Sequence, residues 1–203
     1  MQLALKIDVD TYRGTLEGVP LLLELLDKHQ TRATFLFSLG PDHTGRALKR
    51  VFRPGFLSKV SRTSVVSHYG LKTLMYGVLL PGPDIGKRCK SLLQTVRNHG
   101  HEVGIHTWDH IRWQDGVEHA DEHWTSIEMH KATARFQEIF GETSTTHGAA
   151  GWQMNNHAFE LLDSLNFDYS SDTRGHSPFL PSINGKVMRC PQLPTTLPTL
   201  DEL

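Results

Sequence analysis

This chain contains few cysteines and has almost no net charge. Its 203 residues include 2 cysteines, Cys89 and Cys190, and the formal net charge is −1. Two cysteines so far apart exclude a disulfide framework and lack the spacing of metal ligands, which fits a reducing cytosol. The nearly balanced charge excludes the strong global field that draws a protein to nucleic acid, so we expect no nucleic-acid partner.

Long apolar runs are also missing. No stretch approaches the roughly 20 consecutive apolar residues of a membrane-spanning helix. A strand-like segment begins at about residue 3 and reaches an acidic pair at Asp8, which leaves no room for a signal peptide. The length suits one domain of ordinary size with a sizeable core. We therefore expect one cytoplasmic domain over residues 1–203.

Acidic residues are absent from one segment of the chain. Residues 43–83 contain no Asp or Glu, and apolar and Tyr side chains are interleaved there with basic ones. This composition predicts one or two amphipathic helices that lie on an anionic membrane surface. The basic residues expected to contact lipid headgroups are Arg46, Lys49, Arg50, Arg53 and Lys59. The alternative is a helical insertion that packs on the domain and whose basic face is merely solvated.

Elsewhere, strand-like and helix-like segments alternate. The predicted strands are residues 2–9, 33–38, 102–106 and 167–172, and the predicted helices are residues 19–29, 84–98, 124–140 and 155–165. Apolar residues recur at helical spacing in the predicted helices, and Gly100 and Gly141 follow two of them as stop signals. This alternation predicts a parallel sheet in an α/β barrel or a close relative, with the site at the C-terminal ends of the strands.

Two histidines four residues apart are the first candidates for a site. In a helix or tight helical turn, this spacing places His106 and His110 on one face, where two imidazoles supply half of a tetrahedral metal site. Asp8 and Asp10 alternate at the end of the first predicted strand, where one carboxylate can bind metal while the other acts as a base. The alternatives are a surface or core role for the histidines, and a helix cap or a partner of a ligating histidine for Asp8.

In combination, these motifs resemble the polysaccharide deacetylases, the NodB homology group of carbohydrate esterases. The shared features are Asp-x-Asp at the first strand end, His-x-x-x-His at a later one, and an Asp after the strand near residue 170. The longer matching stretches are residues 7–15, 35–42, 102–110, 149–152, 171–175 and 193–199. They are similar to a branch of the family that removes formyl from undecaprenyl-phosphate-linked 4-deoxy-4-formamido-L-arabinose, in the lipid A modification linked to polymyxin resistance. The resemblance covers essentially the whole chain and implies a distorted (β/α) barrel.

The resemblance also implies a role for each candidate residue. Asp10, His106 and His110 would hold a divalent metal (zinc, cobalt, manganese or nickel), which would lower the pKa of a bound water toward neutrality. Asp8 would take the proton of that water as it attacks the formamide carbon. Asp172 would orient a general-acid histidine. Substrate contacts would come from Arg13, Trp152 and Arg174.

The chain departs from the family pattern at two places. Gln153 stands where relatives carry an arginine that steers the catalytic aspartate, so this contact would come from Arg174 or be absent. The general-acid histidine of the last family motif has no counterpart in a matching context, because His147, His157 and His176 all lie in other surroundings. We therefore expect a barrel that lacks its final strand and helix.

Two classes of function stay open. The first is a metal-dependent amidohydrolase that acts on a lipid-linked formamido sugar at the inner face of the bacterial inner membrane. The second is a catalytically impaired relative that binds lipid phosphate at the membrane surface through residues 43–83. A secreted polysaccharide deacetylase is a third option, which the missing signal peptide disfavours.

Overall fold

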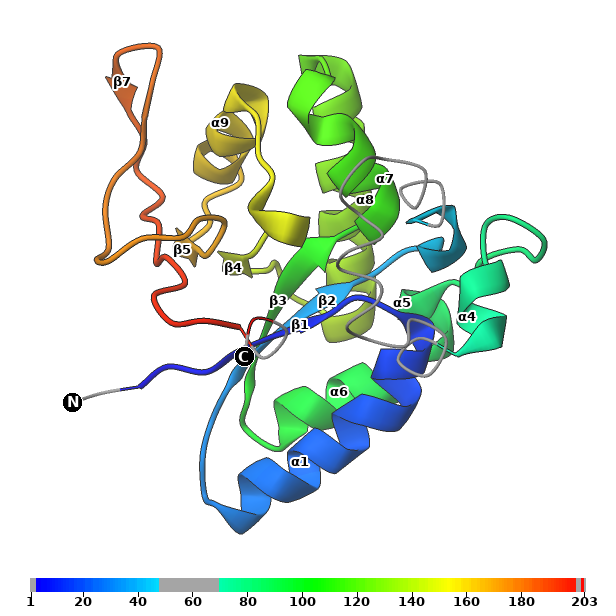
Figure 1. Cartoon of the computed structure of the whole chain (residues 1–203). Coiled ribbons are helices and arrows are strands. Elements are labelled where there is room, and N and C mark those ends of the chain that lie inside the picture. The colour runs from blue at the N-terminus through cyan, green and yellow to red at the C-terminus, as the bar shows by residue number, and fades with distance from the viewer. Residues whose placement is uncertain (1–2, 48–69, 200–201, 203) are drawn as a thin grey trace.

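The chain folds around a parallel sheet. The computed structural model describes residues 3–47, 70–199 and 202. Five strands lie in the order β1–β2–β3–β4–β5, and every neighbouring pair is parallel (Figure 1). Their bounds are Lys6–Val9 (β1), Thr34–Ser38 (β2), Glu102–Thr107 (β3), Thr146–His147 (β4) and Tyr169–Ser170 (β5). A separate antiparallel hairpin consists of β6 (Ser182–Ile183) and β7 (Lys186–Val187).

Helices connect the strands of the sheet. The α-helices are α1 (Val19–Lys28), α4 (Leu71–Met75), α5 (Ile85–Arg88), α6 (Lys90–Asn98), α7 (His110–Gly116), α8 (Glu122–Phe140) and α9 (Asn156–Ser164). The shorter turns of other helical types are η1 (Gly14–Gly18), η3 (Val117–His119) and η4 (Ala150–Trp152). Four helices are capped by a side chain that accepts a hydrogen bond from a first-turn N–H, and these caps are Asp84, Asp109, Asp121 and Asn155. Each cap satisfies a donor that the helix leaves open, so local sequence fixes where these helices begin.

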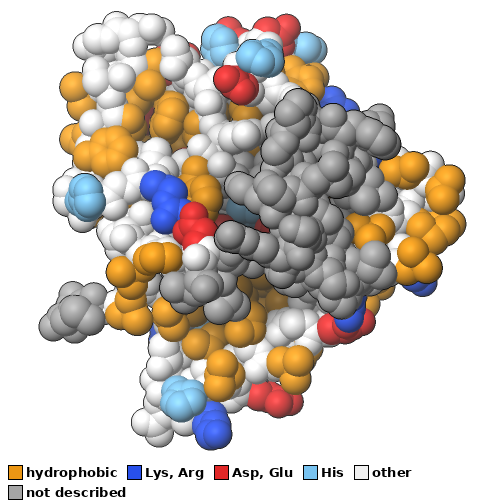
Figure 2. Space-filling model, in the orientation of Figure 1, with side chains coloured by type: hydrophobic (Ala, Val, Ile, Leu, Met, Phe, Trp, Pro, Cys, Tyr) orange, Lys and Arg blue, Asp and Glu red, His pale blue; other side chains and the backbone are white. Residues whose placement is uncertain are grey.

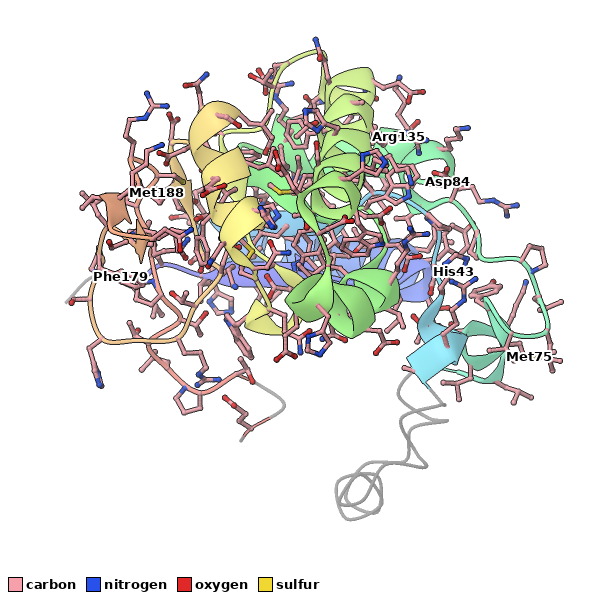
Figure 3. The ribbon with its side chains drawn as sticks, turned by 90° about the horizontal axis from the view of Figure 1, so that it is seen from above. His43, Met75, Asp84, Arg135, Phe179 and Met188 are labelled. Atoms are coloured by element: carbon pink, nitrogen blue, oxygen red, sulfur yellow. The ribbon has the colours of Figure 1, made fainter. Side chains whose placement is uncertain are left out.

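The second strand is the most deeply buried part of the sheet. Phe35, Leu36 and Phe37 are fully buried, and β2 pairs with β1 on one edge and with β3 on the other. A strand buried on both faces has a continuous apolar run in place of an alternating one. Beside it, the buried Arg135 of α8 donates to a backbone carbonyl just after β2 and pairs with Asp84 at 2.5 Å (Figure 3).

Two segments, residues 40–45 and 74–85, run against each other and form what we call the stem. A Cβ on Gly82 would lie 2.1 Å from Asp42 O, and one on Gly45 would lie 2.3 Å from a carbonyl oxygen of the second segment. The backbones are therefore too close for any residue other than glycine at these points. The backbone hydrogen bonds across the stem are Asp42 N to Pro83 O (2.9 Å), Gly45 N to Tyr76 O (3.0 Å) and Ile85 N to Gly40 O (2.9 Å).

The α/β class and the parallel sheet predicted from the sequence are confirmed. The predicted helix over residues 84–98 is instead two helices, α5 and α6, because Cys89 has non-helical backbone angles (φ −105°, ψ 9°). The strand predicted over residues 167–172 pairs only over Tyr169–Ser170. In the part of the chain that the structure describes, the sheet is open and does not close into a barrel.

Most of the predicted basic insertion, residues 48–69, lies outside the described residues. The part that is described contains the five-residue helix α4. Among the helices of the described ranges, none combines the length and the apolar character that crossing a bilayer requires.

Candidate functional site

Three potential metal ligands meet at the C-terminal ends of β1 and β3. Asp10 follows β1, His106 lies in β3, and His110 is the first residue of α7. Asp10 Oδ1 lies 3.2 Å from His106 Nε2, and Asp10 Oδ2 lies 3.4 Å from His110 Nε2. One potential ligand atom from each residue lies within 4.8 Å of the other two. The two histidines meet across a strand-to-helix junction, with His106 near the end of the predicted strand and His110 at the start of α7, and not within one helical turn.

The atoms of this cluster suit a divalent metal. Because a carbonyl oxygen only accepts, the contact between His106 Nδ1 and Gly148 O (2.5 Å) places the proton of the neutral ring on Nδ1. The lone pair of Nε2 in this neutral ring then faces the Asp10 carboxylate, so two acceptors confront each other unless a proton or a cation lies between them. Among the described residues, nothing donates a hydrogen bond to the buried Asp10 Oδ1. A cation would satisfy these atoms, and two imidazoles with one carboxylate are a donor set of catalytic zinc sites.

The electrostatics of the cluster favour positive charge. Burial raises the pKa of Asp10, but His110 and His106 lower it more, so the net pKa is well below the ordinary value. Burial lowers the pKa of His106, whereas the charges of Asp8 and Asp10 raise it more, so the net pKa is above the ordinary value. Both carboxylates therefore act on the same imidazole, and the site attracts a cation.

Asp109, which lies between the two histidines in sequence, fixes the start of the helix that carries His110. Its buried carboxylate accepts a hydrogen bond from Arg112 N (3.1 Å) and thereby caps α7. The other carboxylate oxygen lies 2.6 Å from His43 Nδ1, and His43 belongs to the stem (Figure 3). The stem and the metal-site helix are thus joined by one short polar contact.

Asp8, the predicted base, lies beside a lysine. Lys6 Nζ lies 3.4 Å from Asp8 Oδ2 and donates a hydrogen bond to Ser171 O at 3.1 Å. The Asp8 side chain is 31% exposed, so water reaches it. Residues two apart on a strand point to the same face, and Lys6, Asp8 and Asp10 follow this spacing. The cation next to the predicted base is therefore Lys6.

Two of the predicted substrate contacts, Trp152 and Arg174, lie together. The Arg174 guanidinium carbon lies 4.9 Å from the centre of the Trp152 ring, and Lys6 Nζ lies 5.8 Å from that centre. Trp152 has a left-handed backbone (φ 56°), and its Nε1 donates to Thr195 Oγ1 at 3.2 Å. Arg174 Nη1 donates to both carboxylate oxygens of Glu202 at 2.8 Å each. Through Lys6, this aromatic and basic group adjoins Asp8.

Arg13, the third predicted substrate contact, lies at a different place. Its Nε donates to Glu17 Oε2 at 2.7 Å on the exposed surface. A Cβ on Gly70 would lie 2.9 Å from Arg13 Nη1, so Arg13 packs against the residue that precedes α4. Its role in substrate binding stays a prediction.

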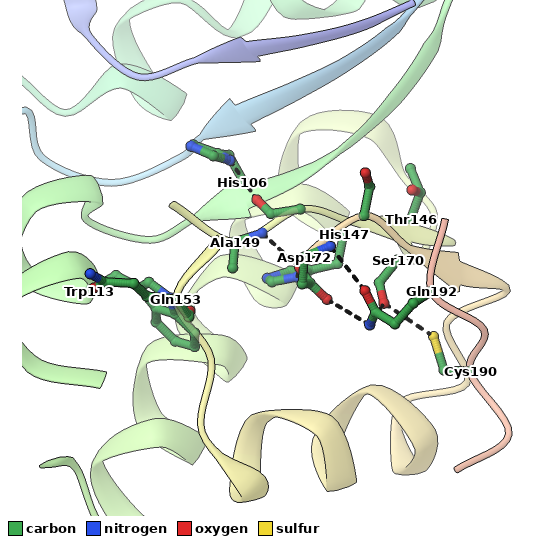
Figure 4. Close-up of polar contacts among 12 residues, drawn as sticks. His106, Trp113, Thr146, His147, Ala149, Gln153, Ser170, Asp172, Cys190 and Gln192 are labelled. Atoms are coloured by element: carbon green, nitrogen blue, oxygen red, sulfur yellow. Dashed lines mark hydrogen bonds and ion pairs between the residues drawn. The ribbon is translucent and has the colours of Figure 1, made fainter. Parts of the chain in front are cut away.

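Asp172 is fully buried and surrounded by hydrogen-bond donors (Figure 4). Its Oδ1 accepts from His147 Nδ1 (2.8 Å) and from Ala149 N (2.6 Å), and its Oδ2 accepts from Gln192 Nε2 (3.2 Å). Burial raises the pKa of Asp172, but His147 and the hydrogen bonds lower it more, so the net pKa is below its ordinary value. The histidine next to Asp172 is thus His147, which is itself buried.

Of the predicted membrane contacts, only Arg46 lies within the described residues, and Lys49, Arg50, Arg53 and Lys59 lie outside them. Arg46 Nε donates to Gly77 O at 3.2 Å, so this side chain braces the stem. Large apolar side chains are exposed on the same part of the molecule, and these are Leu71 (67%), Val78 (53%) and Leu79 (74%). Apolar side chains gather at the edge of the molecule where α4 lies (Figure 2).

Sequence reasoning missed Lys6, Gln192 and the partnership of His147 with Asp172. Lys6 carries a signal, because it precedes Asp8 by two residues on a predicted strand and so shares its face. Gln192 carries none, since it lies 20 residues from Asp172 in a segment without periodicity. His147 has only the weak signal of a polar residue in a short strand.

Comparison with known proteins identifies relatives of the whole chain. A profile of the polysaccharide deacetylase family matches residues 5–170. A protein of Shewanella sediminis (strain HAW-EB3) is 40% identical over 205 residues, which cover 100% of this chain and 65% of that protein. A protein of Wigglesworthia glossinidia brevipalpis is 36% identical over 191 residues, which cover 94% of this chain and 66% of that protein. Both are named probable 4-deoxy-4-formamido-L-arabinose-phosphoundecaprenol deformylase ArnD. This chain thus spans about two thirds of their length.

Solved structures support the fold. A protein from Mycobacterium smegmatis assigned as a polysaccharide deacetylase has a TM-score of 0.64 at 19% identity, over 95% of this chain and 58% of its own. The structure of IcaB from Ammonifex degensii has a TM-score of 0.58 at 14% identity, over 98% of this chain and 68% of its own. At these identities, the likeness concerns the fold alone.

Proposed function

The chain belongs to the polysaccharide deacetylase family, and within that family we propose that it is a metal-dependent deformylase of a lipid-linked formamido sugar. The observation that carries the proposal is the cluster of Asp10, His106 and His110 with Asp8 on the same face of β1. Two relatives with 40% and 36% identity bear the name of a formamido-arabinose-phosphoundecaprenol deformylase, which supports this substrate class.

Asp10, His106 and His110 would hold the metal, which when bound supplies a Lewis acid that lowers the pKa of water. Asp8 accepts the proton of the attacking water at a carboxylate oxygen, and its exposure leaves room for this water. Lys6 holds the Asp8 carboxylate in place from the side. Water adds to the formamide carbon, the C–N bond breaks, formate leaves, and the sugar nitrogen gains the proton that Asp8 accepted and becomes an amine.

Trp152 and Arg174 would bind the sugar phosphate beside the base. A guanidinium recognises a phosphate through hydrogen bonds to its oxygens. In this chain one nitrogen of Arg174, Nη1, donates to both carboxylate oxygens of Glu202, an anion that stands at this position. The aromatic face of Trp152 suits a sugar ring. Arg13 would contact the same substrate from the side of α4.

The substrate lipid would bring the protein to a membrane. We propose that residues 43–83 contact the inner face of the bacterial inner membrane, with Arg46, Lys49, Arg50, Arg53 and Lys59 near anionic headgroups. The exposed Leu71, Val78 and Leu79 support this orientation, because apolar side chains beside basic ones are typical of interfacial segments. An alternative is a catalytically impaired relative that uses the same surface only to bind lipid phosphate.

Formate release from the undecaprenyl-phosphate-linked formamido sugar tests the proposal. The intact protein should release formate, lose this activity with a chelator, and recover it with zinc, cobalt, manganese or nickel. His110→Ala should lose both activity and bound metal by elemental analysis, whereas the control His157→Ala, on α9, should lose neither. Metal binding without formate release by the wild type would favour the lipid-binding alternative.

Binding to liposomes tests the membrane part. Co-sedimentation with anionic vesicles should weaken as salt rises, since each basic residue near the surface contributes roughly 1 kcal/mol before screening. The Leu79→Ser variant should bind less, and the control Leu21→Ser, an exposed leucine on α1, should bind like the wild type. Equal binding to neutral vesicles at all salt concentrations would count against contact through the basic residues.

A further inference from the structure

The loop over residues 147–149 connects a metal ligand to a buried carboxylate. Its middle residue, Gly148, accepts the hydrogen bond from His106 Nδ1 at 2.5 Å. A Cβ on Gly148 would lie 2.3 Å from Leu36 Cδ1, so this backbone presses directly on β2. The direction of the Gly148 carbonyl therefore sets the direction of the His106 ring.

The residues on either side of Gly148 are bound to one oxygen atom. Asp172 Oδ1 accepts from His147 Nδ1 at 2.8 Å and from Ala149 N at 2.6 Å (Figure 4). A single carboxylate oxygen thus holds the loop immediately before and immediately after the carbonyl that orients His106. Hydrogen bonds to an ionised group are about twice as strong as neutral ones, so the Asp172 carboxylate restrains this loop strongly.

Asp172 is itself held by Gln192 at two points. Its backbone N–H donates to Gln192 Oε1 at 3.0 Å, and its Oδ2 accepts from Gln192 Nε2 at 3.2 Å. Gln192 Nε2 also lies 2.6 Å from Ser170 Oγ, and the backbone of Gln192 pairs with that of Phe179. All of Asp172 is buried, which leaves substrate no direct access to its carboxylate.

We propose that Asp172 is a positioning residue for His106, which it orients through the loop 147–149. The carboxylate fixes Gly148, the Gly148 carbonyl keeps the proton on His106 Nδ1, and Nε2 is thereby aimed at Asp10 with its lone pair available. This role differs from the one that the family resemblance implies, in which Asp172 orients a general acid. The inference rests on the proposed metal site.

Metal affinity of the intact protein tests this role without an activity assay. Asp172→Asn keeps the volume of the side chain but removes the charge that holds the loop. Loss of a partner that orients a metal ligand typically lowers affinity by about 10- to 100-fold, and we expect a loss of this size for zinc in competition with a chelator. The visible absorption of the cobalt-loaded variant should shift as well, because it reports the arrangement of the ligands.

Asp163→Asn is the matched control. Asp163 is another buried carboxylate that accepts two backbone N–H groups, Arg189 N (2.8 Å) and Cys190 N (2.9 Å), but it holds a different loop. This variant should lose stability yet bind zinc within about twofold of the wild type, because distant sites act independently. If Asp172→Asn does not fold, Gln192→Met loosens the same carboxylate and should lower zinc affinity by about threefold or more.

Each outcome of these binding measurements supports or overturns the positioning role of Asp172. A folded Asp172→Asn, or Gln192→Met in its place, that binds zinc as tightly as the wild type would overturn the positioning role while leaving the metal site intact. An equal loss in Asp163→Asn would also overturn it, since general loosening would then be the cause. A wild-type protein that binds no divalent metal would overturn the proposed function and this inference together.

Discussion

The two halves of the sheet are held together in different ways. Strands β1, β2 and β3 pair over four residues or more and bury a continuous apolar strand between them. Strands β4 and β5 are two residues long, and their neighbourhood is held by the side chains of His147, Asp172 and Gln192. In the half formed by β1, β2 and β3, which we call the long-strand half, backbone hydrogen bonds between strands hold the architecture. In the half formed by β4 and β5, which we call the short-strand half, buried polar side chains do so.

This difference explains where each kind of functional group sits. A long strand places residues at fixed intervals, so Lys6, Asp8 and Asp10 need little besides β1 to share a face. The loop after β4 has fewer backbone hydrogen bonds, such as that from Gly148 N to Ile105 O (2.9 Å), and the Asp172 carboxylate and the Gln192 amide add to them around the Gly148 carbonyl. Buried polar networks of this kind are stabilising when all of their members are satisfied and costly when one partner is lost.

The long-strand half should keep its bound metal but lose activity when its exposed carboxylate, that of Asp8, is removed. Asp8→Asn should lower deformylase turnover by about 10²- to 10⁴-fold, which is the usual contribution of a general base. Elemental analysis should still find metal, because Asp10, His106 and His110 are unchanged. If Asp8→Asn lost metal as completely as Asp10→Asn, the division between base and ligand would be wrong.

The stability of the long-strand half should depend strongly on the buried side chains of its core. Phe37→Ala removes a fully buried ring from β2 and should lower the free energy of unfolding by about 3–5 kcal/mol, measured by urea titration. The control Phe179→Ala, whose ring is 43% exposed near the hairpin, should lose about 1 kcal/mol or less (Figure 3). Equal losses would mean that the short-strand half depends on apolar packing as much as β2 does.

The stability of the short-strand half should fall in acid. The folded-state pKa of Asp172 lies below its ordinary value, so its stabilisation is present above the unfolded-state pKa of about 3.9 and disappears as the pH falls through the folded-state pKa. Asp172→Asn should cost about 1–3 kcal/mol near pH 7, and the difference from the wild type should shrink in strong acid. Urea midpoints of both proteins across this range provide the check, and a constant difference would contradict it.

The smallest effect is expected at Lys6. Lys6→Met removes the ammonium beside Asp8, and a partly exposed ion pair of roughly 0.2–1 kcal/mol corresponds to at most about a fivefold loss in turnover. Lys6→Arg should restore most of the activity, and metal content should not change in either variant. A loss in the arginine variant as large as in the methionine variant would argue against a simple electrostatic role.

The sequence predicts the long-strand half well. The run Phe35–Leu36–Phe37 and the alternation of Asp8 and Asp10 are both consequences of local backbone geometry, and the structure has strands at both places. The cluster of Asp10, His106 and His110 follows because the C-terminal ends of parallel strands meet at one edge of the sheet.

The short-strand half could not be predicted in the same way. Gln192 reaches Asp172 from a segment without helical or strand periodicity, and only tertiary packing brings the two together. The break at Cys89 also has no signal, because neither glycine nor proline occupies that position. Both features depend on contacts between residues that are remote or on small deviations in backbone angle, which periodicity does not record.

The stem has a consequence for which insertions and deletions this domain can accept. Its two segments are joined by backbone hydrogen bonds and by glycines that leave no room for side chains, so the chain is already closed into a loop at residues 45 and 76. Once a loop is closed, doubling its length adds only about 0.6 kcal/mol of entropy cost. The domain should therefore accept a short glycine and serine linker in place of residues 48–69 and remain folded, which makes this position a splice point where one inserted segment can be exchanged for another without a change in the sheet.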